Sequence, residues 1–373
     1  MSKSTVNLKI YLYELINFSQ KLIFHLKSAL LRQIGITLRG YFSAFLLHCL
    51  IGSAIITITC ITTVTYTMTN RVWVTGDAVV DLIPDTENTY LKCPGGAPAN
   101  VAVAIARLNG DAAFFGRVGQ DPMGRFLKAT LNKESVNSEF MRLDEMQRTS
   151  TVVVDLDANG ERSFTFMVKP SADQFLLPTD IPAFKPHEWL HVCSIALANE
   201  PSRSSTFQAM RDIKRAGGYV SFDPNLREEV WANPSEILDV VREAIALADV
   251  VKFSDDELLY LTQTDSLDQG IAALDAFNNT LVLITQGAKG SIILFEDQQT
   301  LVTVEPIEPV DTTGAGDAFV GGLLAKLASH NDWAERETVF LAVKMANACG
   351  ALATTKKGAM TALPTQNQLL TFL

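Results

Sequence analysis

The sequence lacks the cysteine spacing of a disulfide framework or a zinc site. Its 373 residues include five cysteines, an odd number, and no CxxC pair. They lie far apart in the chain: Cys49, Cys60, Cys93, Cys193 and Cys349. Scattered thiols of this kind are typical of a protein in a reducing compartment, so we expect a cytoplasmic location.

The sequence also lacks a cluster of basic residues, internal repeats and low-complexity tracts. The formal net charge is −10, whereas nucleic acid backbones are bound by clustered Lys and Arg side chains. This balance argues against a nucleic acid partner and favours small molecules. With 47% apolar and 19% charged residues, the chain is long enough to bury one large core or two modest ones.

Residues 1–67 differ in composition from the rest of the chain. They hold six Lys or Arg residues and one acidic residue, Glu14, so they carry a charge of +5 and leave −15 to the remainder. The apolar run over residues 41–66 contains no Asp, Glu, Lys or Arg and is long enough to span a bilayer. Its many Thr, Ile and Val residues weaken the case for a helix.

Two interpretations of this region remain open. An anchor at residues 41–66 would keep the basic flank in the cytoplasm and export everything that follows, whereas Met68 directly precedes TNRVWVTGD, which looks like the beginning of a domain. We therefore predict that residues 1–67 are an extension outside the functional domain, which covers 68–373, and that the membrane is not a partner. A membrane-tethered protein is the alternative, and the long, distant apolar run disfavours a signal peptide.

From residue 68 onward the sequence predicts an α/β fold. Short β-branched runs alternate with longer amphipathic segments, the pattern of a parallel sheet covered by helices. The predicted strands are Arg71–Thr75, Ala112–Gly116, Trp189–Ser194, Tyr219–Asp223, Val250–Phe253, Leu281–Gln286 and Ser291–Glu296. Helices are expected between them, with Pro122 and Pro201 at helix starts and Gly217 at a helix end.

Residues 148–168 interrupt this pattern. Apolar and polar residues alternate with period two on both sides of residues 157–160, which predicts a β-hairpin. Together with residues 79–93 the hairpin is expected to form a small sheet that projects from the main body and acts as a lid. Its strand edges would suit pairing in a homodimer, and an ordinary edge hairpin is the plainer alternative.

The stretch VDTTGAGDAF, residues 310–319, stands directly before an apolar run that predicts a helix. Gly314, Ala315 and Gly316 carry little or no side chain, so their backbone N–H groups can approach an anion at the helix N-terminus. Asp317, in the first turn, can accept a proton from an attacking hydroxyl. An aspartate that only stabilises the helix dipole is the alternative. A second glycine pair, in CPGGAPAN at 93–100, also opens an apolar helix and suggests that both ends of a transferred group are bound.

These stretches resemble the ribokinase/PfkB-type carbohydrate kinase family, in particular the bacterial fructokinases of sucrose utilisation, with aminoimidazole riboside kinases also similar. The two signatures are GGAPANVAVAIARLNG at 95–110 and DTTGAGDAFVGGLL at 311–324. Further matches are GDAVVD (76–81), FGRVGQDPMGRF (115–126), SFDPNLR (221–227), ITQGAKG (284–290) and GALATTKKGAMTALP (350–364). The resemblance covers about four-fifths of the chain but not residues 1–67. It implies a ribokinase-like three-layer αβα sandwich with a projecting β-sheet lid.

The resemblance also implies the roles of the candidate site residues. Asp317 would be the general base, and the backbone of Gly314, Ala315 and Gly316 would stabilise the transferred phosphoryl group. The substrate-side residues would be Asp77, Asp81, Gly95, Gly96, Asn100 and, as a phosphate clamp, Arg227. ATP would lie along Thr285, Gly287 and Gly290, with Asn347 near the adenine. Glu257 would order Mg²⁺ through water, in a motif where Ser254 replaces the usual Asn, and a monovalent cation would be held by Asp311, Thr313, Ala353 and Gly358.

The resemblance implies an ATP- and Mg²⁺-dependent kinase that converts D-fructose to fructose 6-phosphate, with K⁺ as a further ion. Aminoimidazole riboside is the alternative acceptor. A sugar-binding regulator without catalysis is the alternative from another functional class, and the carboxylate of Asp317 beside an anion site argues against it, since a pure binder needs no base there.

Overall fold

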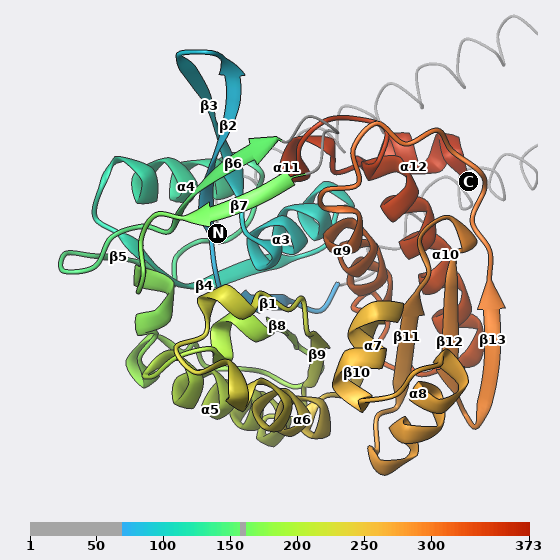
Figure 1. Cartoon of the computed structure of the whole chain (residues 1–373). Helices are drawn as coiled ribbons and strands as arrows, with labels where there is room; N and C mark the ends of the chain where they lie inside the picture. The colour runs from blue at the N-terminus through green and yellow to red at the C-terminus, as the bar shows by residue number, and fades with distance from the viewer. Residues whose placement is uncertain (1–68, 157–161) are drawn as a thin grey trace, which may run out of the picture. The chain divides into compact units, whose positions relative to one another are not determined.

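The computed structural model of the chain describes residues 69–156 and 162–373 (Figure 1). The apolar run at 41–66 and the predicted turn at 157–160 lie outside these ranges. Within them, no helix combines the length and the apolar content that a membrane span requires.

A nine-stranded sheet forms the centre of the described part of the chain (Figure 1). Across the sheet its strands are β13 (Gln298–Val302), β12 (Ser291–Phe295), β11 (Leu281–Thr285), β10 (Val250–Ser254), β9 (Tyr219–Asp223), β8 (Trp189–Cys193), β1 (Val72–Thr75), β4 (Ala112–Gly119) and β5 (Met141–Asp144). The pairs from β11 to β5 are parallel, and β12 and β13 are antiparallel additions at one edge. All seven predicted strands are confirmed to within a few residues at their ends.

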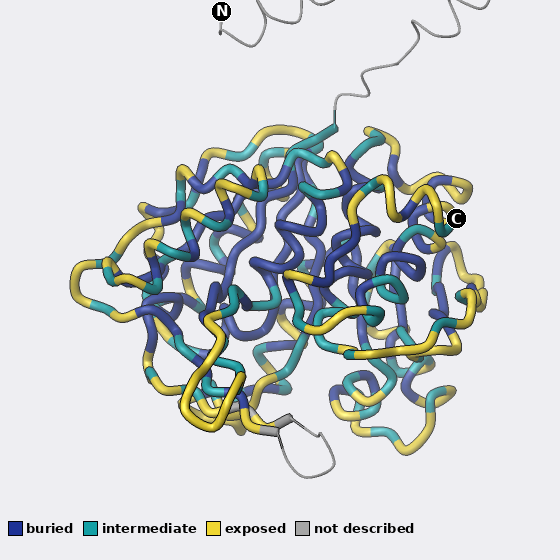
Figure 2. Tube along the Cα trace, turned by 90° about the horizontal axis from the view of Figure 1, so that it is seen from above, coloured by how far each residue is buried: buried dark blue, intermediate teal, exposed yellow. Residues whose placement is uncertain are grey.

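Helices cover both faces of this sheet, because successive strand residues point to opposite sides and both sides are apolar. On β1, for example, Val72 and Val74 pack into one core and Trp73 into the other. One face is covered by α3 (Ala97–Arg107), α4 (Pro122–Lys133), α9 (Ala315–Leu327), α10 (Arg336–Ala353), α11 (Ala359–Ala362) and α12 (Gln366–Phe372). The other is covered by α5 (Ser202–Arg215), α6 (Ile237–Leu247), α7 (Asp255–Thr262) and α8 (Leu267–Ala273). Figure 2 shows the buried strands and helices in the middle and exposed loops around them, so the predicted three-layer αβα sandwich is confirmed.

A second, four-stranded sheet holds the predicted hairpin. Its strands, in spatial order, are β3 (Thr89–Gly95), β2 (Val79–Thr86), β6 (Thr151–Leu156) and β7 (Arg162–Phe166). β2 and β6 pair in parallel, while β2 with β3 and β6 with β7 are antiparallel. Figure 1 shows β2 and β3 extending away from the rest of the domain as a hairpin. The small sheet therefore contains both segments that were predicted to form it, residues 79–93 and the hairpin within residues 148–168.

The helix ends follow the expected chemistry. Pro122 is the first residue of α4, and the side chain of Asp121 caps that helix by accepting hydrogen bonds from the backbone N–H groups of Met123 at 3.0 Å and Gly124 at 2.8 Å. Pro201 is the residue immediately before α5. Gly217 follows the end of α5 with φ +82°, the left-handed conformation that favours glycine.

Candidate active site

The N-terminus of α9 is built on a glycine that no other residue replaces easily. Gly314, the N-cap residue, has φ +79°, and a Cβ atom placed on it would lie 2.9 Å from the Cα atom of Ala359. The chain can therefore make this tight entrance only with glycine. The N–H of Ala315 donates to the backbone oxygen of Thr312 at 3.2 Å. The other N–H groups of the first turn, which includes Gly316, have no intrahelical acceptors, so the helix presents partial positive charge here.

Asp317 lies in that first turn and is 7% exposed. The Nδ2 atom of Asn100, on α3, donates a hydrogen bond of 2.8 Å to Oδ2 of Asp317, so helices that begin at the two glycine motifs meet here. Burial raises the pKa of Asp317, although the Asn100 hydrogen bond and the charges of Lys252 and Arg227 oppose this rise. A carboxylate with a raised pKa and a fixed orientation is suited to act as a general base.

Two further polar atoms nearby have no hydrogen-bond partner among the described residues. They are Oδ1 of Asp77 and Oδ1 of Asn100, and both are buried. A buried polar atom without a partner is costly. Both residues line the large cavity described below, so hydroxyl groups of a ligand are natural partners for these oxygens.

The glycine pair Gly95 and Gly96 gives room for these acids. A Cβ atom on Gly95 would lie 2.2 Å from Oδ2 of Asp81. Gly96 has φ +96°, and its Cβ atom would lie 2.5 Å from the backbone oxygen of Asp77. A larger residue at either position would displace Asp77 or Asp81. The two glycines are therefore needed because the side chain of Asp81 and the backbone of Asp77 pack directly against them.

A cavity of about 1590 Å³ brings most of the predicted residues together. Of the candidates, those that line it are Asp77, Asp81, Gly96, Asn100, Arg227, Asp311, Thr313, Gly314, Gly316, Asp317 and Gly358. Lys357 and Asn225, which the sequence analysis did not single out, line it too. Parts of the small sheet, including Leu91 and Phe166, form one of its walls. The volume exceeds that of a typical small-ligand site and can hold two ligands side by side.

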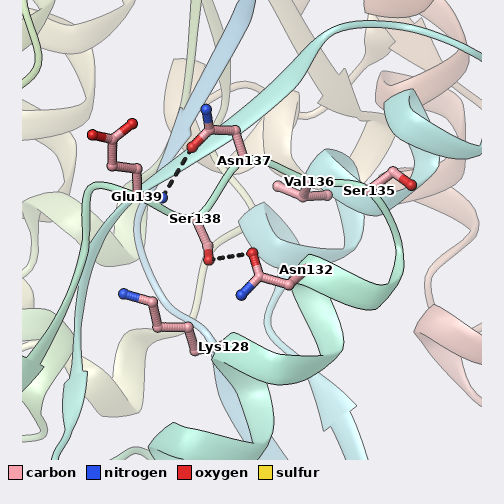
Figure 3. Close-up of a pocket in the computed structure, with 7 residues that line it drawn as sticks. All are labelled: Lys128, Asn132, Ser135, Val136, Asn137, Ser138 and Glu139. Atoms are coloured by element: carbon pink, nitrogen blue, oxygen red, sulfur yellow. Dashed lines mark hydrogen bonds between the residues drawn. The ribbon is translucent and has the colours of Figure 1, made fainter. Parts of the chain in front are cut away.

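A second cavity of about 500 Å³ lies at the C-terminal end of α4 and contains none of the predicted site residues (Figure 3). Its polar groups are largely paired with one another: Ser138 donates to Asn132 at 2.8 Å, and the backbone N–H of Glu139 donates to Asn137 at 2.9 Å. We place the candidate active site in the larger cavity, where buried acids and a helix N-terminus converge.

Several predicted residues do not line the large cavity. Thr285 donates a hydrogen bond of 3.1 Å to the backbone oxygen of Phe253. A Cβ atom on Gly290 would lie 2.1 Å from the backbone oxygen of Val302, so this glycine is needed for chain packing. Asn347 is buried and accepts from Ser291 at 3.1 Å while donating to Val302 at 2.9 Å. Contacts of Thr285, Gly287, Gly290 and Asn347 with a nucleotide therefore stay predictions.

The residues proposed for a monovalent cation form a tight loop. Oδ1 of Asp311 accepts hydrogen bonds from N and Oγ1 of Thr313 at 3.0 and 2.7 Å, and Oδ2 accepts from N of Gly358 at 2.8 Å. Ala353 is fully buried in α10. The loop places carboxylate and hydroxyl oxygens beside the α9 entrance, and these are the ligand atoms that suit hard cations.

Glu257 has a clear structural role. It forms a capping box with Ser254: Oε2 of Glu257 accepts from N of Ser254 at 2.9 Å, and Oγ of Ser254 accepts from N of Glu257 at 3.1 Å. Oε1 accepts from N of Leu226 at 3.1 Å. Burial alone would raise the pKa of Glu257, but the charge of Lys252 and these hydrogen bonds hold it below its usual value. Ser254, whose role the sequence left open, is the cap of α7.

The family profile described as "pfkB family carbohydrate kinase" matches residues 69–366. A fructokinase from Vibrio alginolyticus is 65% identical over 304 residues, which cover 82% of this chain and 99% of that protein. The crystal structure of a fructokinase from Vibrio cholerae O395 with fructose, ADP and calcium ion is 63% identical, with a TM-score of 0.79 over 82% of this chain and 99% of that one. Aminoimidazole riboside kinase from Salmonella enterica, in complex with aminoimidazole riboside and an ATP analogue, is 42% identical, with a TM-score of 0.77 over 81% and 99%.

The fold and the acidic cavity at a helix N-terminus are those of a sugar kinase. The chain belongs to the pfkB family of carbohydrate kinases. The predicted family, fold class and enzyme class are thereby confirmed.

The ionisation of Asp77 gives a test of its environment. Burial and the nearby carboxylates of Asp173 and Asp317 raise its pKa from 3.8 to about 7. Between these two values the folded protein binds the proton more tightly than the unfolded chain, so the free energy of unfolding falls as the pH rises through this window. We expect Asp77→Asn to stabilise the ligand-free protein at pH 8 by roughly 1–4 kcal/mol, with a gain that vanishes towards pH 4. Urea unfolding at both pH values measures this difference, and a variant less stable than the wild type at pH 8 would contradict it.

Proposed function

We propose that this protein transfers the γ-phosphoryl group of ATP to the primary hydroxyl of D-fructose and releases ADP and fructose 6-phosphate. The observation that carries the proposal is the meeting of Asp317, the α9 N-terminus, Asp77 and Asn100 in one cavity. The high identity to fructokinases over nearly their whole length supports fructose as the acceptor.

In the proposed reaction, the carboxylate of Asp317 takes the proton of the hydroxyl group as its oxygen attacks the γ-phosphorus. A new O–P bond forms, the bond between the γ-phosphorus and the β,γ-bridging oxygen breaks, and the electron pair of that bond stays with ADP. The N–H groups around Gly314 and Gly316 stabilise the charge on the transferred group. Asp77, Asp81 and Asn100 hold the other hydroxyl groups of the sugar, because carboxylate and amide oxygens accept hydrogen bonds from polyols. Arg227 and Lys357 line the same cavity and supply positive charge to phosphate oxygens.

We propose Mg²⁺ as the ion that accompanies ATP. Mg²⁺ is usually bound through phosphate oxygens, waters and one or two carboxylates. Both oxygens of Glu257 are within hydrogen-bonding distance of backbone N–H groups, and their remaining lone pairs suit contact through water. When bound, the ion neutralises phosphate charge. The Asp311 loop is proposed as the K⁺ site.

The four-stranded sheet is proposed to act as the lid. Asp81, Leu91, Cys93, Val152 and Phe166, which belong to it, line the cavity, so its position decides how much water reaches the sugar. Exclusion of water protects the phosphoryl group from hydrolysis. Pairing of two lids in a homodimer, and a cytoplasmic location, stay predictions from the sequence.

The acceptor is tested by assaying ADP release with D-fructose and with aminoimidazole riboside in separate reactions, each with and without K⁺. We expect kcat/KM for fructose to exceed that for the riboside by roughly 100-fold and activity to rise with K⁺. A higher kcat/KM for the riboside than for fructose would show that the riboside, and not fructose, is the acceptor. Tight fructose binding by calorimetry without any ADP release would instead favour the sugar-binding regulator.

A further inference from the structure

A lysine is buried in the middle of the large sheet. Lys252, on β10, is 7% exposed, and its strand neighbours Val251 and Phe253 are fully buried. Its Nζ atom lies 3.2 and 3.1 Å from Oδ1 and Oδ2 of Asp223, on β9, and 3.9 Å from Oε2 of Glu257. Burial alone would lower the pKa of Lys252, yet the carboxylates of Asp223, Glu257 and Asp317 raise it above its usual value. The two carboxylates within ion-pair distance of Nζ favour the positively charged lysine.

This charge lies directly behind the first turn of α9. A Cβ atom placed on Gly316 would be 3.5 Å from Nζ of Lys252, and Gly316 lines the cavity. The ammonium and the helix N-terminus thus direct positive potential to the same point. Stabilisation of the sheet does not account for this arrangement, because a buried ion pair adds little net stability compared with apolar side chains.

We propose that Lys252 is a positioning residue for phosphoryl transfer: its ammonium, fixed by Asp223 and Glu257, favours the negatively charged state of Asp317 and of the phosphoryl group at the α9 entrance. The inference rests on the kinase function proposed above. It adds an electrostatic element that does not touch the sugar.

The charged and titratable groups around Asp317 come from several elements. Lys252 on β10 and Arg227 after β9 lower its pKa, as does the hydrogen bond from Asn100, whereas burial raises it. Asp77 after β1, Asp223 on β9 and Cys193 on β8 also interact electrostatically with Asp317. Removal of the ammonium takes away one of two nearby positive charges, so the proton of Asp317 should be bound more tightly.

The test is Lys252→Met in the full chain, assayed with fructose and ATP. We expect kcat to fall about 30-fold with a fructose KM within about twofold of the wild type, because a nearby unit charge is lost but no sugar contact is. We expect the acidic limb of kcat/KM against pH to move up by about one unit. A kcat within threefold of the wild type, or a fall in kcat without movement of this limb, overturns the proposal. Fructose phosphorylation by the wild type tests the function separately.

Two variants accompany this test. Lys214→Met removes a lysine that pairs with Asp249 on the outside of the protein, at 2.5 Å, and should leave kcat and the pH profile unchanged. Asp223→Asn keeps the ammonium and is nearly isosteric, so it serves even if Lys252→Met does not fold. In this variant the acidic limb of kcat/KM against pH should keep its position or move to lower pH. The reason is that the asparagine no longer neutralises the charge of Lys252, which then favours the carboxylate form of Asp317 more strongly. An upward movement would contradict the proposal.

Discussion

Asp317→Asn lowers kcat for fructose phosphorylation by about 10²- to 10⁴-fold, the contribution of a general base. The amide has nearly the shape of the carboxylate and keeps an oxygen for the hydrogen bond from Asn100, so the site should stay assembled. It cannot take the proton of the attacking hydroxyl. We therefore expect the fructose KM to remain within about threefold of the wild type, as measured by steady-state ADP release. The part of the acidic limb of the pH profile that reflects Asp317 should disappear, whereas the part that reflects Asp77, with its pKa of about 7, should remain.

A matched control for this substitution is Asp256→Asn. Asp256 also lies in the first turn of a helix, α7, but its side chain is exposed. Its loss should cost only the helix-dipole interaction, about 0.3–1 kcal/mol of stability, and leave kcat unchanged. If Asp317→Asn retained kcat within tenfold of the wild type while folded, Asp317 would be only a dipole-stabilising residue.

The central strands could be predicted because they are apolar on both faces. Tyr219–Asp223 has the predicted bounds, and its buried residues pack between two helical layers. The strands at the two edges of the sheet were not predicted. Met141–Asp144 buries only its first residue and Gln298–Val302 only its last, so neither carries an apolar run. They join the sheet because the neighbouring strand has backbone N–H and C=O groups free to hydrogen-bond with them. The amino-acid pattern within the edge strand itself does not show this.

The site shows the same division. The acid and the glycines at the α9 entrance could be predicted because their chemistry is local to one motif. The pair of Lys252 and Asp223 was missed because the two residues are brought together by the adjacency of β9 and β10. One local signal was available: the single charge inside the apolar run VVKF, residues 250–253, must find a partner once the strand is buried on both faces.

Gly314→Ala tests the other half of the proposed machinery, the backbone of the α9 entrance. A methyl group at this position would lie 2.9 Å from Cα of Ala359, and the residue must keep φ +79°. Either the left-handed conformation is kept under strain, or the first turn of α9 moves away from α11. We expect unfolding to become easier by about 1–3 kcal/mol, and kcat to fall by about 100- to 1000-fold, because displaced N–H groups no longer face the charge on the phosphoryl group.

The contribution of strain alone can be measured at Gly217, which shares the conformation but not the location. It has φ +82°, and an added Cβ atom would be 3.7 Å from Cβ of Pro186, an ordinary contact. Gly217→Ala should therefore lose about 1 kcal/mol of stability and retain full kcat in the same urea and kinetic assays. A comparable loss of kcat in both variants would make instability the cause. The substitution forces the backbone at the α9 entrance to shift, because the added Cβ atom would lie too close to Ala359. Full activity in Gly314→Ala would therefore show that the N–H groups of this entrance do not stabilise the transferred group.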